Sequence, residues 1–224
     1  DVNKVHMYSP KELSDRMTRI KDLLLDPNSQ WEKRVEALKE VRAIVIAGGP
    51  DYDDFYQLLR QMEPSFAMSA KDLRSQVVRE ACVSIAYLSQ QLQSRFDHFA
   101  ETLLPNLVAL IPNSAKIMST SGHVCIRMII NNTHAPRLIP IITGHLQSKS
   151  SVIRRECIQY LEQLLVTWPT HTLERHIAVL QEAIKRGIMD ADAEARTHAR
   201  KAYWGFAEHF KDQADALLNS LDPA

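Results

Sequence analysis

The sequence contains few of the residues that interrupt helices, because only 6 of its 224 residues are glycine and 10 are proline. It has no Asn-Gly pair between two alternating apolar runs, which is the commonest signal of a β-hairpin. It also has no stretch approaching the roughly 20 uncharged apolar residues that cross a bilayer. These absences predict an all-α chain without a membrane partner.

Net charge is also absent, since 27 Lys and Arg residues balance 27 Asp and Glu residues. Proteins that bind nucleic acids usually carry an excess of basic residues, so we expect no nucleic-acid partner. Any electrostatic attraction to a protein partner must then come from the position of the charges. At 224 residues, 45% of them apolar, the chain can bury a substantial core as one elongated domain.

Cysteine is scarce: the three thiols are Cys82, Cys125 and Cys157. None has a second Cys or a His at the short spacing of a zinc site, and an odd number argues against a disulfide framework. We interpret all three as small buried apolar residues in a reducing cytosol, rather than as metal or redox groups. We expect no metal site and no cofactor.

The N-terminus, Asp1, lacks an initiator Met and a charged-then-apolar leader, so we interpret the chain as part of a longer protein. Enzyme motifs are missing as well. Gly48-Gly49 is not followed by Gly-Lys-Ser, and no Gly-x-Ser-x-Gly occurs. The segment Asp190 to Glu194 lacks the Gly and the final Glu of a calcium loop, and helix capping explains its acids better. The sequence predicts no catalytic residues and no enzyme activity.

What the sequence does contain is a repeat. A basic residue followed three places later by a small or apolar one recurs at Arg34, Arg79, Arg154 and Arg196. The steps of 45, 75 and 42 residues suggest one further, imperfect copy at His123. Helical hairpins repeated every 40 to 47 residues are the HEAT and armadillo class.

Apolar spacing of i, i+3, i+4 and i+7 resolves each repeat into two helices. The first helices are predicted at 11–25, 52–66, 96–111, 135–147 and 173–189. The second helices are predicted at 31–47, 75–92, 122–132, 151–167 and 194–210. The repeats are therefore expected at 11–47, 52–92, 96–132, 135–167 and 173–210, with a partial repeat at 212–224. The expected architecture is one paddle-like α-solenoid of about six HEAT repeats.

Stacked hairpins place their short intra-repeat loops along one edge, where the second helices begin. Aromatic and basic residues gather at these starts, as on surfaces that bind acidic proteins. Trp31 opens a helix beside a loop, so we favour an exposed anchor over a core residue, and we assign Trp168 and Trp204 to the core. The predicted contact residues are Trp31, Lys71, Arg74, Lys116, Met118, Lys149, Arg155, Arg196, Arg200 and Lys201.

For Arg79, Arg154 and Arg196 a structural role is at least as plausible as binding. Their fixed place in the repeat suits a ladder of ion pairs between repeats, with acids such as Asp190 and Asp192.

Several segments resemble a known family: residues 69–83 (SAKDLRSQVVREACV), 110–119 (LIPNSAKIMS), 133–144 (THAPRLIPIITG) and 173–207. They are similar to the TOG domains of the cytoplasmic-linker-associated proteins (CLASP), most of all to the second TOG domain. The resemblance implies αβ-tubulin and the microtubule lattice or plus ends as partners. It also implies a cytoplasmic, cytoskeletal regulator that promotes rescue and suppresses catastrophe at plus ends, the mitotic spindle and kinetochores. The domain is expected to be monomeric within a larger multidomain protein.

In this family an aromatic residue of the first loop contacts β-tubulin and basic residues of the last loops contact α-tubulin, which maps onto Trp31 and onto Lys149, Arg196 and Arg200. The family's pattern continues beyond the sixth repeat, whereas this chain ends at Ala224. The alternative is a generic HEAT scaffold that assembles a phosphatase or a transport receptor. Such a scaffold usually binds along its concave helical face rather than along its loops.

Overall fold

The structure is a computed structural model that describes residues 2–221, and within them it contains helices and turns but no β-strand. The all-α prediction is therefore confirmed. By backbone contacts the chain forms two compact units, residues 1–133 and residues 134–224. No helix in the described part is both long and apolar enough to cross a membrane.

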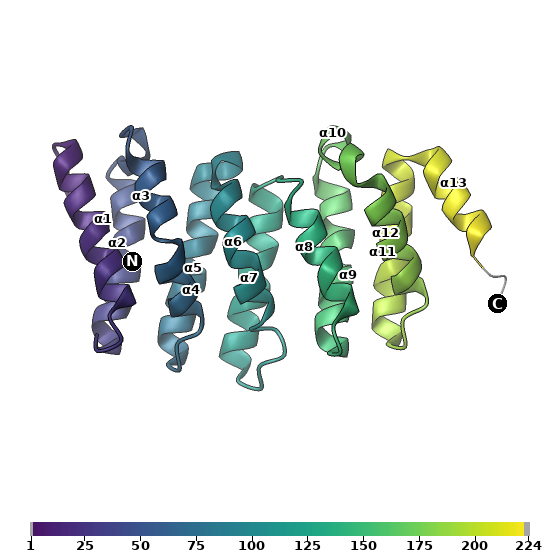
Figure 1. Ribbon diagram of the computed structural model, residues 1–224, viewed down its shortest axis with the longest axis horizontal. Helices are drawn as coiled ribbons and strands as arrows, with labels where there is room; N and C mark the ends of the chain where they lie inside the picture. The colour runs from purple at the N-terminus through teal and green to yellow at the C-terminus, as the bar shows by residue number, and fades with distance from the viewer. Residues whose placement is uncertain (1, 222–224) are drawn as a thin grey trace. The chain divides into compact units, whose positions relative to one another are not determined.

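Unit 1 consists of helical hairpins stacked side by side (Figure 1). Its α-helices are α1 (Pro10–Leu25), α2 (Trp31–Ile46), α3 (Phe55–Gln61), α4 (Glu63–Ala70), α5 (Ser75–Leu92), α6 (Asp97–Val108) and α7 (Lys116–Asn132). Two short 3-10 helices, η1 (Gly49–Asp51) and η2 (Gln93–Phe96), join hairpins.

Two layers of helices enclose the core of unit 1. The second helices α2, α5 and α7 pack on one another in one layer, and α1, α4 and α6 form the other. On α5 the buried positions include Val78, Cys82, Ile85 and Leu92, spaced by three, four and seven residues along one helical stripe. That stripe faces the neighbouring helices, which explains why one hairpin alone would not be stable.

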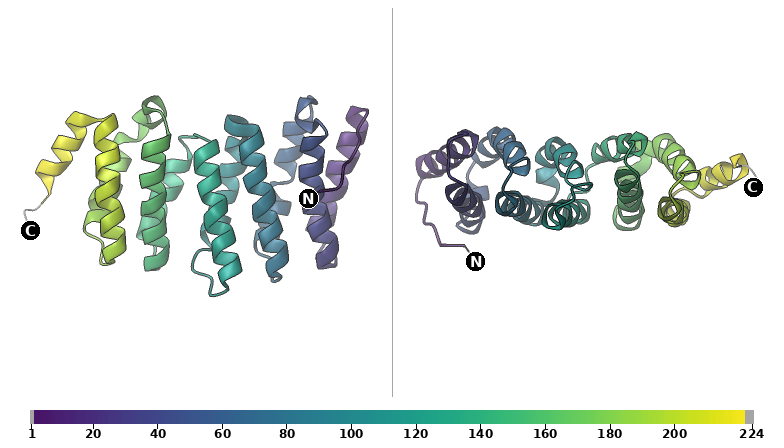
Figure 2. Two further views of the ribbon diagram at one scale, coloured as in Figure 1. Left: turned by 180° about the vertical axis from the view of Figure 1, so that it is seen from behind. Right: turned by 90° about the horizontal axis from the view of Figure 1, so that it is seen from below.

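Unit 2 repeats this arrangement. Its helices are α8 (Leu138–Gly144), η3 (His145–Gln147), α9 (Ser151–Thr167), α10 (Thr170–Leu173), η4 (Glu174–His176), α11 (Ile177–Ile188), α12 (Ala193–His209) and α13 (Lys211–Ser220). Helices α9 and α12 pack along each other, and α8 and α11 lie in the second layer (Figure 2). A Cβ on Gly187 would lie 2.7 Å from Ile158 Cδ1 and 2.8 Å from Ala199 Cβ, so only glycine lets α11 approach both second helices this closely.

Five of the ten predicted helices, namely 11–25, 31–47, 75–92, 151–167 and 194–210, are confirmed to within one residue at each end. The predicted helix 96–111 ends three residues early, at Val108, and the other three of the first helices are interrupted. The predicted helix 52–66 breaks at Met62 into α3 and α4, because Pro64 in the first turn of α4 cannot donate a backbone hydrogen bond. The predicted helix 135–147 becomes α8 and η3, and 173–189 begins as α10 and η4 before α11. The last three residues of the predicted partial repeat 212–224 lie outside the described residues.

One predicted boundary is wrong by a full turn and a half. Helix α7, which is the second helix of the third repeat, begins at Lys116 rather than at Gly122. The side chain of Asn113 accepts a hydrogen bond from the Ala115 backbone N–H at 2.8 Å, and this turn starts the helix early. Lys116 and Met118 are therefore helical residues, not loop residues.

The tryptophans divide differently from the prediction. Trp168 is buried, as predicted, and its ring centroid lies 5.7 Å from that of His134. Trp204 was predicted in the core, and this is wrong, because 67% of it is exposed. The buried stripe of α12 passes through Ala199, Ala202, Tyr203 and Phe206, and leaves Trp204 on the outer side.

The three cysteines are free and buried, as expected for small core residues. Burial, together with the negative charge of Glu156, raises the pKa of Cys157 to about 12. Burial, with a hydrogen bond to Cys82, raises the pKa of Cys125 well above its ordinary value. The thiols of Cys125 and Cys157 thus stay protonated near neutral pH, which disfavours metal binding and oxidation at these two residues.

Candidate protein-binding edge

The intra-repeat turns of unit 1 lie at one end of its hairpins, at the lower side of Figure 1. They comprise residues 26–30, 71–74 and 109–115, which precede α2, α5 and α7. Because stacked hairpins run in the same direction, successive turns become neighbours in space although some 40 residues separate them in sequence. We call this row of turns the loop edge of unit 1.

Trp31 is the first residue of α2 and lies on this edge, only partly buried. The Arg74 guanidinium carbon lies 5.5 Å from the centroid of the Trp31 ring, which is cation–π geometry. Trp31, Arg74, Lys71, Met68 and Leu73 line an open hollow of about 790 Å³. The structure thus brings three of the predicted contact residues together around one aromatic ring.

An ion pair fixes this arrangement. Arg34 Nη1 lies 2.6 Å from Asp72 Oδ2, and the two side chains are only 15% and 7% exposed. Arg34 Nη2 also donates to the Asp26 carbonyl at 2.9 Å, and Asp72 Oδ1 accepts from the Arg74 backbone N–H at 2.8 Å. One pair therefore ties the turn before Trp31 to the turn that carries Arg74.

Two predicted contacts of unit 1 lie outside this hollow. Among the residues that the structure describes, those that line the hollow lie between 27 and 34 and between 68 and 74. Lys116 and Met118 instead belong to the first turn of α7. Lys116 is exposed and Met118 is partly buried. They extend the loop edge of unit 1 without joining the Trp31 hollow.

In unit 2 the turns before α9 and α12 likewise lie at one end of the unit. Lys149 is exposed there, while Arg154 and Arg196 are held by the chain itself. Arg154 forms two hydrogen bonds with Asp190, at 3.0 and 3.3 Å, and donates to the carbonyl of Lys149 at 3.2 Å. Arg196 donates to the Asp190 carbonyl at 2.8 Å. The predicted pairing between repeats is therefore confirmed for Arg154, whereas Arg196 binds the turn before its own helix. Arg79 is exposed and forms no ion pair within residues 2–221, so the ladder does not extend to it.

The Asp190 carboxylate is the centre of that ladder. Its burial would raise its pKa, but hydrogen bonds from Arg154 and from the Asp192 backbone N–H, and the charges of Arg154 and Arg196, outweigh burial. The pKa of Asp190 is consequently lower than usual. Asp192 caps α12, as expected, by accepting from the Ala195 backbone N–H at 2.9 Å.

Arg155 also has acidic neighbours. Its guanidinium lies 3.2 Å from Glu194, 3.5 Å from Asp192 and 3.8 Å from Glu156. The other two predicted cations, Arg200 and Lys201, are exposed, and neither has an ion-pair partner within residues 2–221. The cations of α12 that form no ion pair, Arg200 and Lys201, thus lie about two turns after the start of the helix.

The sequence places Leu73 on the loop edge, but Leu73 is not among the predicted contact residues. In the structure it is 95% exposed and lines the hollow beside Trp31. The available signal was an apolar residue inside the otherwise charged turn Lys71-Asp72-Leu73-Arg74. A leucine held in water at the tip of a turn suits contact with a partner protein.

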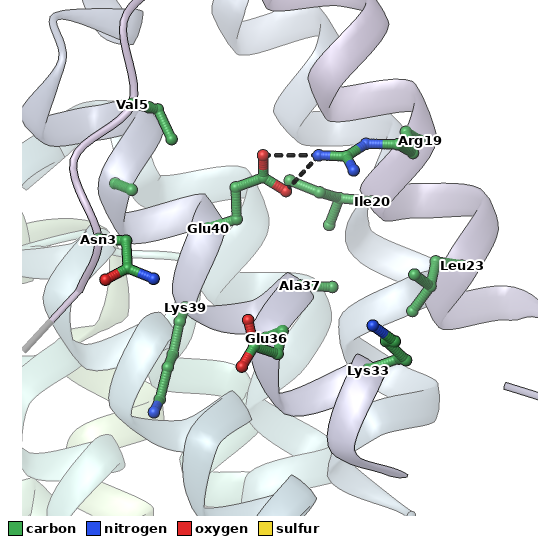
Figure 3. A pocket seen from close by; sticks show the side chains of 11 residues that line it. Asn3, Val5, Arg19, Ile20, Leu23, Lys33, Glu36, Ala37, Lys39 and Glu40 are labelled. Atoms are coloured by element: carbon green, nitrogen blue, oxygen red, sulfur yellow. Dashed lines mark hydrogen bonds and ion pairs between the residues drawn. The ribbon is translucent and has the colours of Figure 1, made fainter. Parts of the chain in front are cut away.

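A second hollow, of about 430 Å³, lies between the extended N-terminal segment and the α1–α2 hairpin (Figure 3). Glu40 crosses it and accepts from Arg19 at 2.7 and 2.8 Å and from Arg16 at 2.8 Å. None of its described lining residues is a His, Cys or Ser that could act as nucleophile or general base. No group of three or more potential metal ligands occurs in the described part of the chain.

Comparison with known proteins agrees with the helical repeat. The chain matches the family described as CLASP N terminal over residues 13–224. It is 51% identical over 222 residues to CLIP-associating protein 1-A of Xenopus laevis, covering 99% of this chain and 15% of that protein. It is 39% identical over 226 residues to the CLIP-associating protein of Drosophila melanogaster, covering 100% of this chain and 15% of that protein.

Among solved structures, one similar chain comes from work on tubulin recruitment and assembly by microtubule polymerases with TOG domain arrays. Its TM-score is 0.70 at 18% identity, over 98% of this chain and 45% of that one. This likeness confirms the HEAT-repeat TOG fold. The match to the CLASP N-terminal family over residues 13–224 and the identity to CLIP-associating proteins show that the chain belongs to the CLASP family.

Proposed function

We propose that this chain is a tubulin-binding TOG domain that meets αβ-tubulin through its loop edge. The hollow around Trp31 carries the proposal. It combines a partly exposed indole, an apolar Leu73 tip and the cations Lys71 and Arg74, which is the composition of an interface hot spot for an acidic protein.

The comparisons support this partner. The relatives are named as CLIP-associating proteins, and the solved chain of similar fold comes from work on tubulin recruitment. We propose further that residues 1–224 act as one domain, the second TOG domain, monomeric within a larger multidomain protein. That protein would act in the cytoskeleton, at microtubule plus ends, the spindle and kinetochores, where it promotes rescue and suppresses catastrophe.

The individual contacts follow from which side chains are available. On unit 1 we assign tubulin contact to Trp31, Lys71, Leu73, Arg74, Lys116 and Met118. On unit 2 we assign it to Lys149, Arg200 and Lys201. Arg155 and Arg196 already bind acids or carbonyls of this chain, so we assign them a smaller share of the binding energy.

The alternative is a HEAT scaffold for other proteins, with no affinity for tubulin. A scaffold that binds along its helix faces would not need an aromatic residue and cations gathered at the intra-repeat turns. Neither role requires catalysis, and nucleotide hydrolysis by the purified chain without tubulin would contradict both.

The decisive experiment replaces Trp31 with alanine and measures co-sedimentation with microtubules and gel filtration with free tubulin dimer. Loss of a hot-spot aromatic typically costs about 2 kcal/mol, so affinity should fall roughly 30-fold. Ile46→Ala is the matched control, because Ile46 is 58% exposed at the opposite end of the same helix. Unchanged binding by a folded Trp31→Ala protein would refute the assignment of this edge.

A further inference from the structure

The exposed Trp204 is not used by the loop edge. It lies in the fourth turn of α12, on the side opposite the buried Ala199, Ala202 and Phe206. Its ring packs edge-on against Tyr203 at a centroid distance of 5.1 Å. With 67% of this residue in solvent, the chain leaves a large apolar surface in water. Exposed tryptophans are uncommon on monomer surfaces but common at the centres of interfaces.

A second exposed apolar residue lies beside it. Val166, near the end of the neighbouring α9, is 77% exposed. Gly205 and Leu165, the chain neighbours of Trp204 and Val166, mark where the two helices approach most closely, since a Cβ on Gly205 would lie 3.1 Å from Leu165 Cβ. Because α8 and α11 cover the other side of α9 and α12, Trp204 and Val166 share the outer surface at this crossing.

Charge along the same stripe of α12 is ordered. Arg200 and Lys201 precede Trp204 by one turn, about 6 Å along the helix at 1.5 Å per residue. Both are exposed, and neither forms an ion pair with any residue from 2 to 221. Glu208, one turn after Trp204, is exposed as well. The stripe therefore runs from two available cations through an indole to one carboxylate.

The acids near this stripe do not neutralise those two cations. Glu162 on α9 lies 2.7 Å from His198, and Glu194 lies 3.2 Å from Arg155. A ligand approaching α12 from solvent thus meets positive charge beside Arg200 and Lys201 and apolar surface beside Trp204 and Val166. We call these four residues the α12 strip.

We propose that the α12 strip binds an acidic amphipathic segment of a partner protein, with carboxylates against Arg200 and Lys201 and apolar side chains against Trp204 and Val166. A helical segment repeats its side chains every turn, which matches the spacing of the cations from the indole. This surface lies on helix faces of unit 2 and shares Arg200 and Lys201 with the proposed tubulin contacts. Its role nevertheless does not require tubulin to bind at the Trp31 hollow, because Trp204 and Val166 belong to the strip alone.

The test uses the whole chain and a fluorescein-labelled synthetic helical peptide that carries Glu-Glu one turn before Leu-Leu, followed by anisotropy. A control peptide replaces Glu-Glu with Lys-Lys. The acidic peptide should bind and the basic one should not. Trp204→Gln, and separately Arg200→Gln with Lys201→Gln, should each weaken binding by about tenfold or more.

The matched control is Trp31→Gln, which should leave peptide binding unchanged even where it abolishes tubulin binding. Trp31→Gln and Trp204→Gln therefore distinguish a failure of the Trp31 hollow from a failure of the α12 strip, although both proposals use Arg200 and Lys201. In the wild-type chain, titration with the acidic peptide should shift the Trp204 indole N–H resonance and leave that of buried Trp168 in place. This measurement keeps the test valid even where a Trp204 variant misfolds.

Three results would overturn the proposal: equal binding of the basic peptide, peptide affinity that survives loss of Trp204, or an unshifted Trp204 resonance. Binding to vesicles of phosphatidylserine and phosphatidylcholine without binding to the acidic peptide would also overturn it, in favour of a lipid surface.

Discussion

The Arg34 guanidinium lies 2.6 Å from the Asp72 carboxylate, and this one ion pair joins the helix that begins with Trp31 to the turn that presents Leu73. Both side chains are largely buried, so water screens the pair less than it screens a surface pair. The pair gives the Trp31 hollow a fixed shape before any partner arrives. Such preorganisation reduces the entropy lost on binding.

We therefore expect Arg34→Gln and Asp72→Asn to weaken tubulin binding although neither residue needs to touch tubulin. The double variant should lose little more than either single variant, because both changes remove the same interaction. Binding assays on the three proteins, with ¹⁹F NMR of 5-fluorotryptophan at Trp31, check this. Additive losses, or an unchanged Trp31 resonance, would show that the pair does not position the indole.

The adjacent residues Arg154 and Arg155 should behave differently. Arg154→Ala leaves the Asp190 carboxylate, only 8% exposed, without its main partner, and should cost about 2–4 kcal/mol of stability. Arg155→Ala removes longer contacts at 3.2 to 3.8 Å, one of them to the exposed Glu194, and should cost less than about 1 kcal/mol. Thermal melts of the two variants decide the matter, and equal melting temperatures would contradict this division.

Acid should destabilise unit 2 through Asp190. Its pKa in the folded chain is below the ordinary value of 3.8, so the unfolded chain takes up this proton first as pH falls. The stabilisation is complete above about pH 5 and is lost as pH falls through 3.8 toward the folded pKa. Melting temperature against pH should fall less steeply for Asp190→Asn than for the wild type. A parallel profile for the two proteins would rule out this contribution.

Tubulin binding should weaken with salt although the net charge is zero. The proposed contacts include the exposed cations Lys71, Lys116, Lys149, Arg200 and Lys201. The screening length shortens from about 14 Å near 0.05 M salt to about 6 Å near 0.3 M, so affinity should drop roughly tenfold over that range. Lys39→Gln, a cation on α2 away from the loop edge, is the control for general charge effects. Salt-independent affinity would remove these cations from the interface.

Much of the fold was predictable from local pattern. Second helices such as 75–92 and 151–167 were located to the residue, because a buried stripe at 3.6-residue spacing is a property of the sequence itself. The break at Met62 and the early start of α7 were not, since Pro64 and the turn at Asn113 act over only a few residues and leave the apolar period intact. The ends of a helix depend on such single local interactions, whereas the apolar periodicity that locates the helix does not.

The candidate site shows the same division. The sequence by itself determined that aromatic and basic residues stand where second helices begin, because the repeat fixes their register. Only tertiary structure decided which of them are available. Arg154 and Arg155 are neighbours in sequence, yet only Arg154 forms a close, largely buried ion pair with Asp190, 36 positions further along the chain.

Trp168 and Trp204 both follow an apolar period late in a second helix, and both were assigned to the core. Trp168 is the C-cap residue of α9, is buried, and has its ring centroid 5.7 Å from that of His134. Trp204 precedes Gly205 on α12 and is 67% exposed. A helical period defines a stripe about a third of the circumference wide, and residues at its margin are buried or exposed according to how closely the next helix approaches. That approach is set by residues more than 30 positions away, here Leu165 against Gly205, which no local pattern contains.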